Sequence, residues 1–126
     1  MHQALEKLTT NEPVSADDDI ISSPTYIGTI VSSLQEIITC GMTGVYNIAD
    51  KEPLSKYQLL LNLANKLNRS SLVTKERLHS KVLAKRPKNT SLNVGKFSHA
   101  FNVTRPLNQK EALQRLCKDF EERHSR

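Results

Sequence analysis

Hydrophobic residues recur at helical spacing in four stretches of the chain, at residues 2–9, 24–39, 55–67 and 108–120. In each stretch the apolar positions are three or four residues apart, which places them on one face of an α-helix. The most extensive apolar face lies in the second stretch and consists of Ile27, Ile30, Val31, Leu34, Ile37 and Ile38. The pattern therefore predicts four amphipathic helices.

The residues at the ends of two of these stretches are typical of helix boundaries. Ser23 and Pro24 open the second stretch; a serine hydroxyl caps a free backbone N–H, and proline has no N–H to leave unpaired. Gly41 follows that stretch, where glycine commonly ends a helix. Ser55 and Gln58 have the spacing of a capping box, which predicts that the third helix starts at this serine.

Three shorter segments, at residues 13–15, 44–49 and 72–74, indicate extended structure. The second reads GVYNIA; it is apolar, favours β-structure and lies between turn signals, as expected for a buried strand of a parallel sheet. Periodicity is lost in the polar, basic stretch 85–93, and Asn93 is positioned to cap a short helix beyond it. The alternation of helices and strands predicts an α/β fold.

Length and composition fit one ordinary globular domain, with 126 residues, 37% hydrophobic and 25% charged. No apolar stretch approaches the length of a membrane span, and the first ten residues contain no apolar signal region. We therefore expect a cytoplasmic protein with no membrane partner. In that compartment Cys40 and Cys117 are expected to be reduced, and the four histidines lack metal-ligand spacing, so we expect no metal site.

The formal net charge of +5 favours an anionic partner, either a nucleic acid, an acidic membrane or a small molecule that carries phosphate. A small basic excess is also common on a solvated surface. The densest cluster of basic residues comprises Lys81, Lys85, Arg86 and Lys88. The three tyrosines and three phenylalanines do not alternate with this cluster, and no RNA-binding strand motif or zinc-finger spacing occurs. A nucleic-acid partner is therefore supported by charge alone and is not expected.

The sequence contains no recognisable catalytic motif. No glycine-rich loop of a dinucleotide fold is present, and no tyrosine is followed four residues later by lysine. Asp17, Asp18 and Asp19 form a run of three adjacent carboxylates, and they predict an exposed acidic turn because no apolar pocket is apparent around them. We therefore expect no catalytic residue and no bound coenzyme in this chain.

Three segments, taken in order, resemble the dTDP-4-dehydrorhamnose reductases. Residues 18–26 read DDIISSPTY, similar to the family pattern DDQxGSPT. Residues 44–49 followed by 55–57 read GVYNIA and SKY, similar to a strand and a helix start of the family. Residues 86–97 read RPKNTSLNVGKF, similar to the most recognisable C-terminal signature, RPxNSxL(D/N)xxKL. The order and spacing of the three segments strengthen the resemblance, which covers nearly the whole chain.

The resemblance implies the C-terminal portion of an extended short-chain dehydrogenase, whose NAD(P)-binding fold is Rossmann-like, with the coenzyme-binding half missing. It implies that residues 1–126 form a sugar-nucleotide substrate-binding domain and that residues 44–49 complete the nucleotide-binding sheet. The implied function is binding of a nucleotide-diphosphate sugar during an NADPH- or NADH-dependent reduction of a 4-keto sugar. Coenzyme and proton donor would come from a missing N-terminal part, so we expect no turnover by this chain alone.

The resemblance also implies substrate-binding residues. Arg86, in a loop stiffened by the following proline, would bind the diphosphate through its guanidinium fork; pairing with a surface carboxylate is the other role that fits. Thr25 and Tyr26 would face the sugar, although capping and core packing fit them as well. Asn89 fits either a ligand contact or a turn, and Lys96 is expected to be a surface charge.

The segment at 18–26 also departs from the family pattern. Ile20 replaces glutamine, Ser22 replaces glycine, and Gly28-Thr29 replaces arginine and aspartate early in the helix. One relative of these reductases, the beta subunit of methionine adenosyltransferase, shares the RPxN signature and acts as a regulatory subunit. A non-catalytic interaction subunit is therefore the second reading, and a small basic nucleic-acid-binding domain is the third.

The apolar character of residues 24–39 and 44–49 carries one further expectation. In the family these elements pack against the coenzyme-binding half, so in this chain one helix face and both strand edges would lack partners. Open strand edges and exposed apolar patches favour association. We therefore expect marginal stability, or self-association through Ile30, Ile37, Val45 and Ile48.

Overall fold

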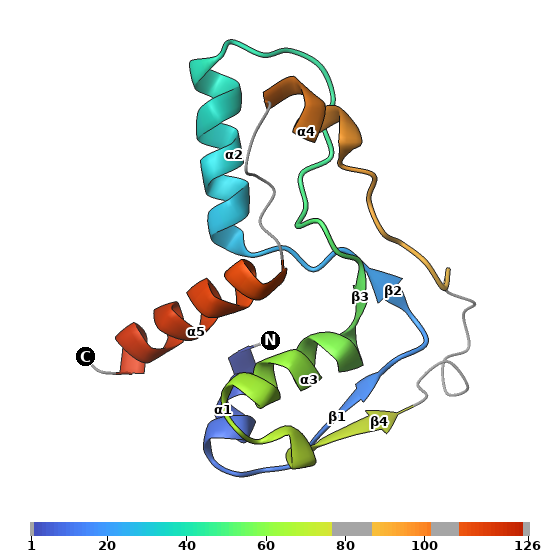
Figure 1. The fold of residues 1–126 in the computed structure, drawn as a ribbon, viewed down its shortest axis with the longest axis vertical. Helices are drawn as coiled ribbons and strands as arrows, with labels where there is room; N and C mark the ends of the chain where they lie inside the picture. Colours follow the sequence, from blue (N-terminus) through green and yellow to red (C-terminus); the bar gives the residue numbers. More distant parts are fainter. Residues whose placement is uncertain (1, 77–86, 102–108, 125–126) are drawn as a thin grey trace. The chain divides into compact units, whose positions relative to one another are not determined.

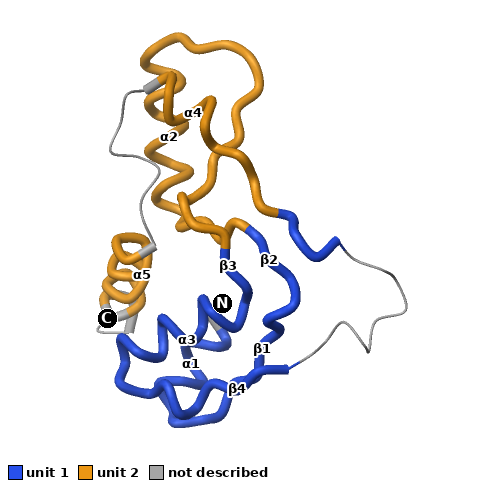
Figure 2. The backbone as a smooth tube through the Cα atoms, turned by 45° about the vertical axis from the view of Figure 1, so that its right-hand side comes forward, with its two compact units in different colours: residues 1–22, 54–90 blue, residues 23–53, 91–126 orange. Residues whose placement is uncertain are grey.

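The computed structural model describes residues 2–76, 87–101 and 109–124 and is an α/β structure, as predicted (Figure 1). The chain forms two compact units, each assembled from two stretches of sequence (Figure 2). Unit 1 contains residues 1–22 and 54–90, and unit 2 contains residues 23–53 and 91–126. Among the described residues, no helix has both the length and the apolar character needed to cross a bilayer.

Unit 1 is built on two parallel strands, β1 (Val14–Asp17) and β4 (Val73–Glu76). Their register pairs Val14 with Val73 and Asp17 with Glu76. Helix α3 (Lys56–Lys66) packs on both strands, and α1 (His2–Thr9) contacts β1. The buried hydrophobic side chains of this unit are Leu5, Leu8, Val14, Ala16, Leu60, Leu63, Ala64 and Val73. The predicted extended segments at 13–15 and 72–74 correspond to these two strands.

A second pair of strands in unit 1 is short and antiparallel. It consists of β2 (Ile21–Ser22) and β3 (Leu54–Ser55). Helix α3 follows β3 directly, and Ser55 and Gln58 form the predicted capping box. The Gln58 amide donates to Ser55 Oγ at 3.0 Å, and the Ser55 amide donates to Gln58 Oε1 at 3.0 Å. A 3-10 turn, η1 (Ser70–Leu72), leads from α3 into β4.

Unit 2 contains the helices α2 (Ile27–Thr39), α4 (Gly95–Phe101) and α5 (Gln109–His124). The Gly95 amide donates to Asn93 Oδ1 at 2.9 Å, so Asn93 helps to start α4 as predicted. The largest fully buried side chain of unit 2 among the described residues is Phe97. It packs edge to face against Tyr46, with 6.4 Å between the ring centroids. Helix α5 begins near the predicted position and buries Leu113.

The predicted start of α2 is wrong by several residues, whereas its predicted end is confirmed. The helix begins at Ile27, with Tyr26 as the N-cap residue. Ser23 does not cap it, because the Ser23 hydroxyl accepts a hydrogen bond from the Leu92 amide at 2.9 Å instead. At the other end Gly41 adopts a φ of +61°, a left-handed conformation that glycine tolerates without steric cost.

Helix α2 turns much of its predicted apolar face toward solvent. Ile27, Val31, Leu34 and Ile38 are 66%, 50%, 47% and 77% exposed. The buried side chains of this helix are instead Thr29 and Ser33. We call these four exposed residues the α2 stripe. Successive members are four, three and four positions apart in the sequence, which is the spacing of a helix face that packs against another helix.

The strand predicted at residues 44–49 is absent, since these residues form no strand in the described part of the chain. A strand exists only where a neighbour pairs with its backbone, and the two sheets of unit 1 do not include this segment. Val45 is 82% exposed, whereas Ala49 is fully buried. Apolar composition alone therefore did not establish a strand here.

Candidate functional site

Ile21, Ser55 and Asn89, one residue from each of the three segments that carry the family resemblance, meet in unit 1. On one side of the β2 backbone, Ile21 pairs antiparallel with Ser55. On the other side it forms a parallel bridge with Asn89. The Ile21 amide donates to the Lys88 carbonyl at 2.8 Å, and the Thr90 amide donates to the Ile21 carbonyl at 2.9 Å. The described part of the basic signature segment is thus held along β2 by main-chain hydrogen bonds, and the Thr90 hydroxyl adds a side-chain bond to the Ile21 carbonyl at 3.2 Å.

Asp18 joins the first two segments through its carboxylate. Ser55 Oγ donates to Asp18 Oδ1 at 2.5 Å, and Lys75 Nζ donates to Asp18 Oδ2 at 2.7 Å. These two donors, the Lys75 ammonium first, hold the pKa of Asp18 below its usual value. Lys75 also lies over the Tyr57 ring, 4.8 Å from its centroid. Asp18 and Lys75 therefore interact mainly with each other and with the neighbouring side chains of Ser55 and Tyr57.

The acidic turn is less exposed than predicted. The Asp17 side chain is only 6% exposed, and its Oδ1 accepts a hydrogen bond from the Asp19 amide at 2.8 Å. Asp17 lies at the end of β1, which is packed between α1, α3 and β4, and this packing buries it. Of the three aspartates, Asp19 alone is exposed.

In unit 2 a carboxylate far along the chain caps the start of α2. The Tyr26 amide donates to Asp50 Oδ2 at 2.8 Å, and Thr29 Oγ1 donates to Asp50 Oδ1 at 2.8 Å. Asp50 is 5% exposed and Thr29 is 1% exposed. Burial raises the pKa of Asp50, and the two donors oppose that rise only in part. Sequence analysis missed Asp50; the available signal was a carboxylate directly after an apolar segment.

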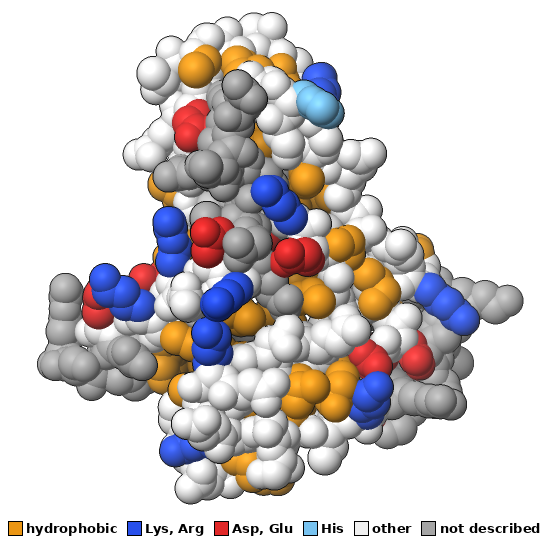
Figure 3. All heavy atoms as spheres, in the orientation of Figure 1, with side chains coloured by type: hydrophobic (Ala, Val, Ile, Leu, Met, Phe, Trp, Pro, Cys, Tyr) orange, Lys and Arg blue, Asp and Glu red, His pale blue; other side chains and the backbone are white. Residues whose placement is uncertain are grey.

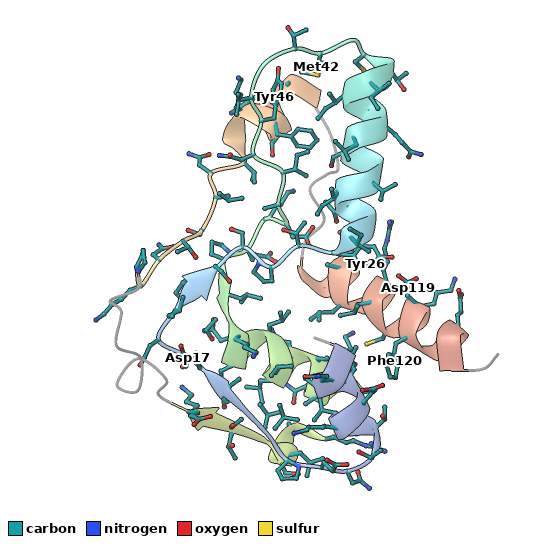
Figure 4. All side chains as sticks on the ribbon, turned by 180° about the vertical axis from the view of Figure 1, so that it is seen from behind. Asp17, Tyr26, Met42, Tyr46, Asp119 and Phe120 are labelled. Atoms are coloured by element: carbon teal, nitrogen blue, oxygen red, sulfur yellow. The ribbon has the colours of Figure 1, made fainter. Side chains whose placement is uncertain are left out.

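The Tyr26 side chain makes contacts through its hydroxyl group and through its ring. Its hydroxyl donates to Asp119 Oδ2 of α5 at 2.6 Å, and Figure 4 shows the two side chains close together. This hydrogen bond raises the pKa of Tyr26, because it stabilises the protonated phenol beside a carboxylate. The ring lies against Gly28, where an added Cβ would come within 2.3 Å of Tyr26 Cε1. Gly28 thus leaves room for the Tyr26 ring, and Thr29 donates a hydrogen bond to Asp50.

The predicted site residues fall into three groups. Thr25 and Tyr26 are half-buried in unit 2, and the Thr25 hydroxyl donates to the Ser23 carbonyl at 3.0 Å. Asn89 is exposed beside β2 in unit 1. Arg86 lies outside the described residues. Of the other roles that fitted Thr25 and Tyr26, their contacts support packing within unit 2, whereas Tyr26, the N-cap residue of α2, makes no side-chain capping bond.

Lys96 is exposed, as expected, but it is not an isolated surface charge. Its Nζ donates to the Val45 carbonyl at 2.9 Å and lies 4.5 Å from the centroid of the Tyr46 ring. The Asn47 side chain in turn donates to the Asn93 carbonyl at 3.0 Å. These contacts fasten the segment predicted as a strand to the start of α4. Lys96 therefore has a structural role within unit 2.

Basic side chains do not gather into one large patch on the face shown in Figure 3. Lysines and arginines are scattered over that face, and several lie beside aspartate or glutamate. A duplex nucleic acid is bound by neutralising many regularly spaced phosphates. The charge pattern on this face does not favour such a partner.

A family model for the RmlD substrate-binding domain matches residues 1–122. The chain belongs to this family. The match confirms the resemblance to dTDP-4-dehydrorhamnose reductases that the three segments predicted. No curated protein sequence matches the chain.

Solved structures of dTDP-4-dehydrorhamnose reductases share the fold of this RmlD-type domain. The enzyme from Bacillus anthracis, solved in complex with NADP, is 18% identical with a TM-score of 0.80, over 94% of this chain and 42% of that chain. The enzyme from Yersinia enterocolitica is 17% identical with a TM-score of 0.77, over 88% and 39%. The enzyme from Clostridium acetobutylicum is 16% identical with a TM-score of 0.80, over 95% and 43%.

The RmlD-type domain therefore spans about two fifths of the length of these reductases. At such low identity the comparison establishes the fold alone, which is an α/β fold like the C-terminal portion of these dTDP-4-dehydrorhamnose reductases. The four glycines of the sequence do not form a dinucleotide-binding loop.

Proposed function

We propose that this chain binds a nucleotide-diphosphate sugar, as the substrate-binding part of an NAD(P)H-dependent 4-keto-sugar reductase of deoxysugar synthesis. The observation that carries the proposal is the convergence at Ile21 of the three segments that define the family resemblance. The family match over residues 1–122 supports it. Coenzyme and proton donor are expected from protein outside these 126 residues.

Each proposed contact follows from the chemistry of its side chain. Arg86 is the candidate for the diphosphate, because a guanidinium binds two phosphate oxygens at once. Asn89 follows three residues later and is exposed, and its side-chain amide has groups that donate and accept hydrogen bonds. Thr25 and Tyr26 are the candidates for the sugar. Asp18 and Lys75 are less suited to a ligand, because they already pair with each other.

Calorimetric titration of dTDP into the 126-residue chain tests the role of Arg86. Removing one charge-assisted fork costs roughly 1.5–3 kcal/mol, which is about 10- to 100-fold in affinity. We expect Arg86→Ala to lose that much. Lys66→Ala is the matched control, because it removes one exposed positive charge from the end of α3. Equal weakening by both variants, or none by Arg86→Ala, would contradict the assignment.

We also propose that the α2 stripe contacts the coenzyme-binding part of the complete protein. The stripe contains no charged residue, and its spacing suits a helical neighbour. Soluble monomers rarely expose large contiguous apolar patches unless these patches bind something. The matched reductases have more than half of their length outside the region that this chain covers, which supplies a candidate for that neighbour.

A further inference from the structure

The segment that leads from α2 to β3 has a backbone without partners. Residues 43–50 form no hydrogen bond between main-chain groups with any other residue in the described part of the chain. Their side chains nevertheless alternate as along a strand, since Val45 and Asn47 are exposed whereas Tyr46 and Ile48 are half-buried. An extended stretch whose backbone groups are unpaired is a template to which another strand can be added.

The two edges of this segment differ. In an extended chain the N–H and C=O of one residue point to one edge, and those of the next residue point to the other. The Val45 carbonyl is occupied, because Lys96 Nζ donates to it at 2.9 Å. A lysine on a strand edge hinders pairing with another strand. We therefore call the edge with the Val45 and Asn47 backbone the closed edge, and the edge with the Tyr46 and Ile48 backbone the open edge.

A second copy of the same segment can satisfy the open edge. In an antiparallel pair centred on Asn47, Tyr46 of one copy faces Ile48 of the other, and each of them both donates and accepts a main-chain hydrogen bond. A twofold contact places each residue near its own copy, so a charged residue would repel itself. Residues 43–49 carry no charge, and Asp50, which follows them, is 5% exposed and accepts two hydrogen bonds at the start of α2. No charge within the segment therefore opposes the pairing.

We propose that the open edge pairs with the open edge of a second copy of this chain, and that Lys96 prevents pairing at the closed edge. One open edge accepts one neighbour, whereas two open edges allow a sheet to grow without end. Association through this segment therefore stops at a dimer. The inference concerns the chain by itself; it goes beyond nucleotide-sugar binding and does not depend on it.

Sedimentation velocity over a range of concentrations tests the pairing. Ile38→Asp is the reference chain, because it disables the α2 stripe and leaves residues 43–50 unchanged, and we expect it to form reversible dimers. Adding Ile48→Pro removes an N–H of the open edge and should weaken the dimer about 10- to 100-fold. Adding Val45→Pro is the matched control; it removes an N–H of the closed edge and should change the dimer affinity by less than about threefold.

The same measurement tests the role of Lys96. Lys96→Met, added to the reference chain, removes the group that occupies the Val45 carbonyl and so opens the second edge. We expect this variant to form species larger than a dimer, in amounts that rise with concentration. If it sediments as the reference chain does, Lys96 does not limit the association.

A disulfide cross-link tests the register without any proline variant. In the proposed pair the two Asn47 Cα atoms lie about 4.5 Å apart, a distance that a disulfide can span. Asn47→Cys, combined with Cys40→Ser to remove the exposed native thiol, should therefore link two copies on mild oxidation. Thr43→Cys in the same background is the control, because Thr43 is exposed but lies away from the twofold axis, and it should stay unlinked.

Three results would overturn the inference. The first is a reference chain that remains monomeric up to about 1 mM, a concentration at which even a weak pairing is populated. The second is equal weakening of the dimer by Ile48→Pro and Val45→Pro. The third is cross-linking of Thr43→Cys as readily as Asn47→Cys.

Discussion

Asp50 provides the sharpest test of how this fold is held together. The side chain caps α2 from 24 residues away, and the cap residue Tyr26 makes no side-chain capping bond of its own. Asp50→Ala removes the acceptor of both the Tyr26 amide and the Thr29 hydroxyl. Asp50→Asn keeps one side-chain carbonyl oxygen that can accept a hydrogen bond from the Tyr26 amide. Its side-chain NH₂ group can donate a hydrogen bond to the Thr29 hydroxyl oxygen. The two variants therefore separate hydrogen bonding from charge.

The structure gives the size of the expected effects. Loss of a helix cap costs about 1 kcal/mol, and leaving a buried polar group such as the Thr29 hydroxyl without its partner costs about 1–3 kcal/mol. Part of this loss is offset, because alanine also removes the desolvation penalty of a buried carboxylate. We expect Asp50→Ala to lower the free energy of unfolding by about 2 kcal/mol, and Asp50→Asn by less than about 1 kcal/mol at neutral pH.

The pH dependence supplies an independent signature of Asp50. Burial raises its pKa in the folded chain above the usual 3.8, so the folded state binds this proton more tightly than the unfolded chain does. The stability that this group contributes is fully present below pH 3.8 and is lost as the pH rises through the folded pKa. Asparagine does not titrate. The stability of the parent chain relative to Asp50→Asn should therefore fall as the pH rises above 3.8.

Urea unfolding followed by far-ultraviolet circular dichroism, repeated across that pH range, measures both effects. Comparing the parent chain with Asp50→Asn cancels the titration of all other groups. If Asp50→Ala unfolds within about 0.5 kcal/mol of the parent chain, the long-range cap does not stabilise α2. If the difference between the parent chain and Asp50→Asn does not change with pH, the burial of the carboxylate is not what the structure indicates.

Three further predictions concern other parts of the chain. Ser55→Ala should lower the free energy of unfolding by about 1–2 kcal/mol in urea, because it removes the cap of α3 and the hydrogen bond to Asp18; an unchanged unfolding midpoint would contradict this. The lowered pKa of Asp18 contributes stability that is present above pH 3.8 and lost as the pH falls through the folded pKa. Lys75→Met should therefore flatten the acid side of the stability profile, and an unaltered profile would show that the ion pair contributes nothing. Ile38→Asp should reduce concentration-dependent light scattering of the isolated chain without lowering its melting temperature; a parent chain that is monomeric at all concentrations would refute association through the α2 stripe.

Local signals in the sequence predicted local features well. The capping box at Ser55 and Gln58 formed as expected, because both partners lie within one helical turn. Gly41 ended α2 for a similarly local reason, since its left-handed conformation is readily adopted by glycine. The three family segments were recognisable because each is a short local pattern, and Ser55 and Asn89, from two of them, both pair with Ile21 of the first in unit 1.

Features that depend on distant residues could not be predicted. Ser23 and Pro24 have the composition of a helix start, but α2 begins later because Asp50 supplies the cap. The partner of the Tyr26 hydroxyl, Asp119, is 93 residues away. The exposure of the α2 stripe also depends on what packs against it, and periodicity cannot tell a face that meets the same domain from one that meets another.

The residues expected to mediate self-association differ in their exposure. Val45 is exposed, as that prediction requires, whereas Ile30, Ile37 and Ile48 are half-buried. Ile27 and Ile38, on the same helix, are more exposed than any of these three. The helical spacing showed that an apolar face exists, but its rotation relative to the rest of unit 2 required the structure. Self-association itself stays a prediction.

The most direct test of the central claim is a titration of the isotope-labelled chain with dTDP-rhamnose, followed residue by residue by NMR. We expect saturable shifts in the amide signals of Thr25 and Tyr26 and of the segment 88–90, and loss of the shifts at 88–90 in Arg86→Ala. Shifts scattered over the surface without saturation, or none at millimolar ligand, would contradict nucleotide-sugar binding by this chain.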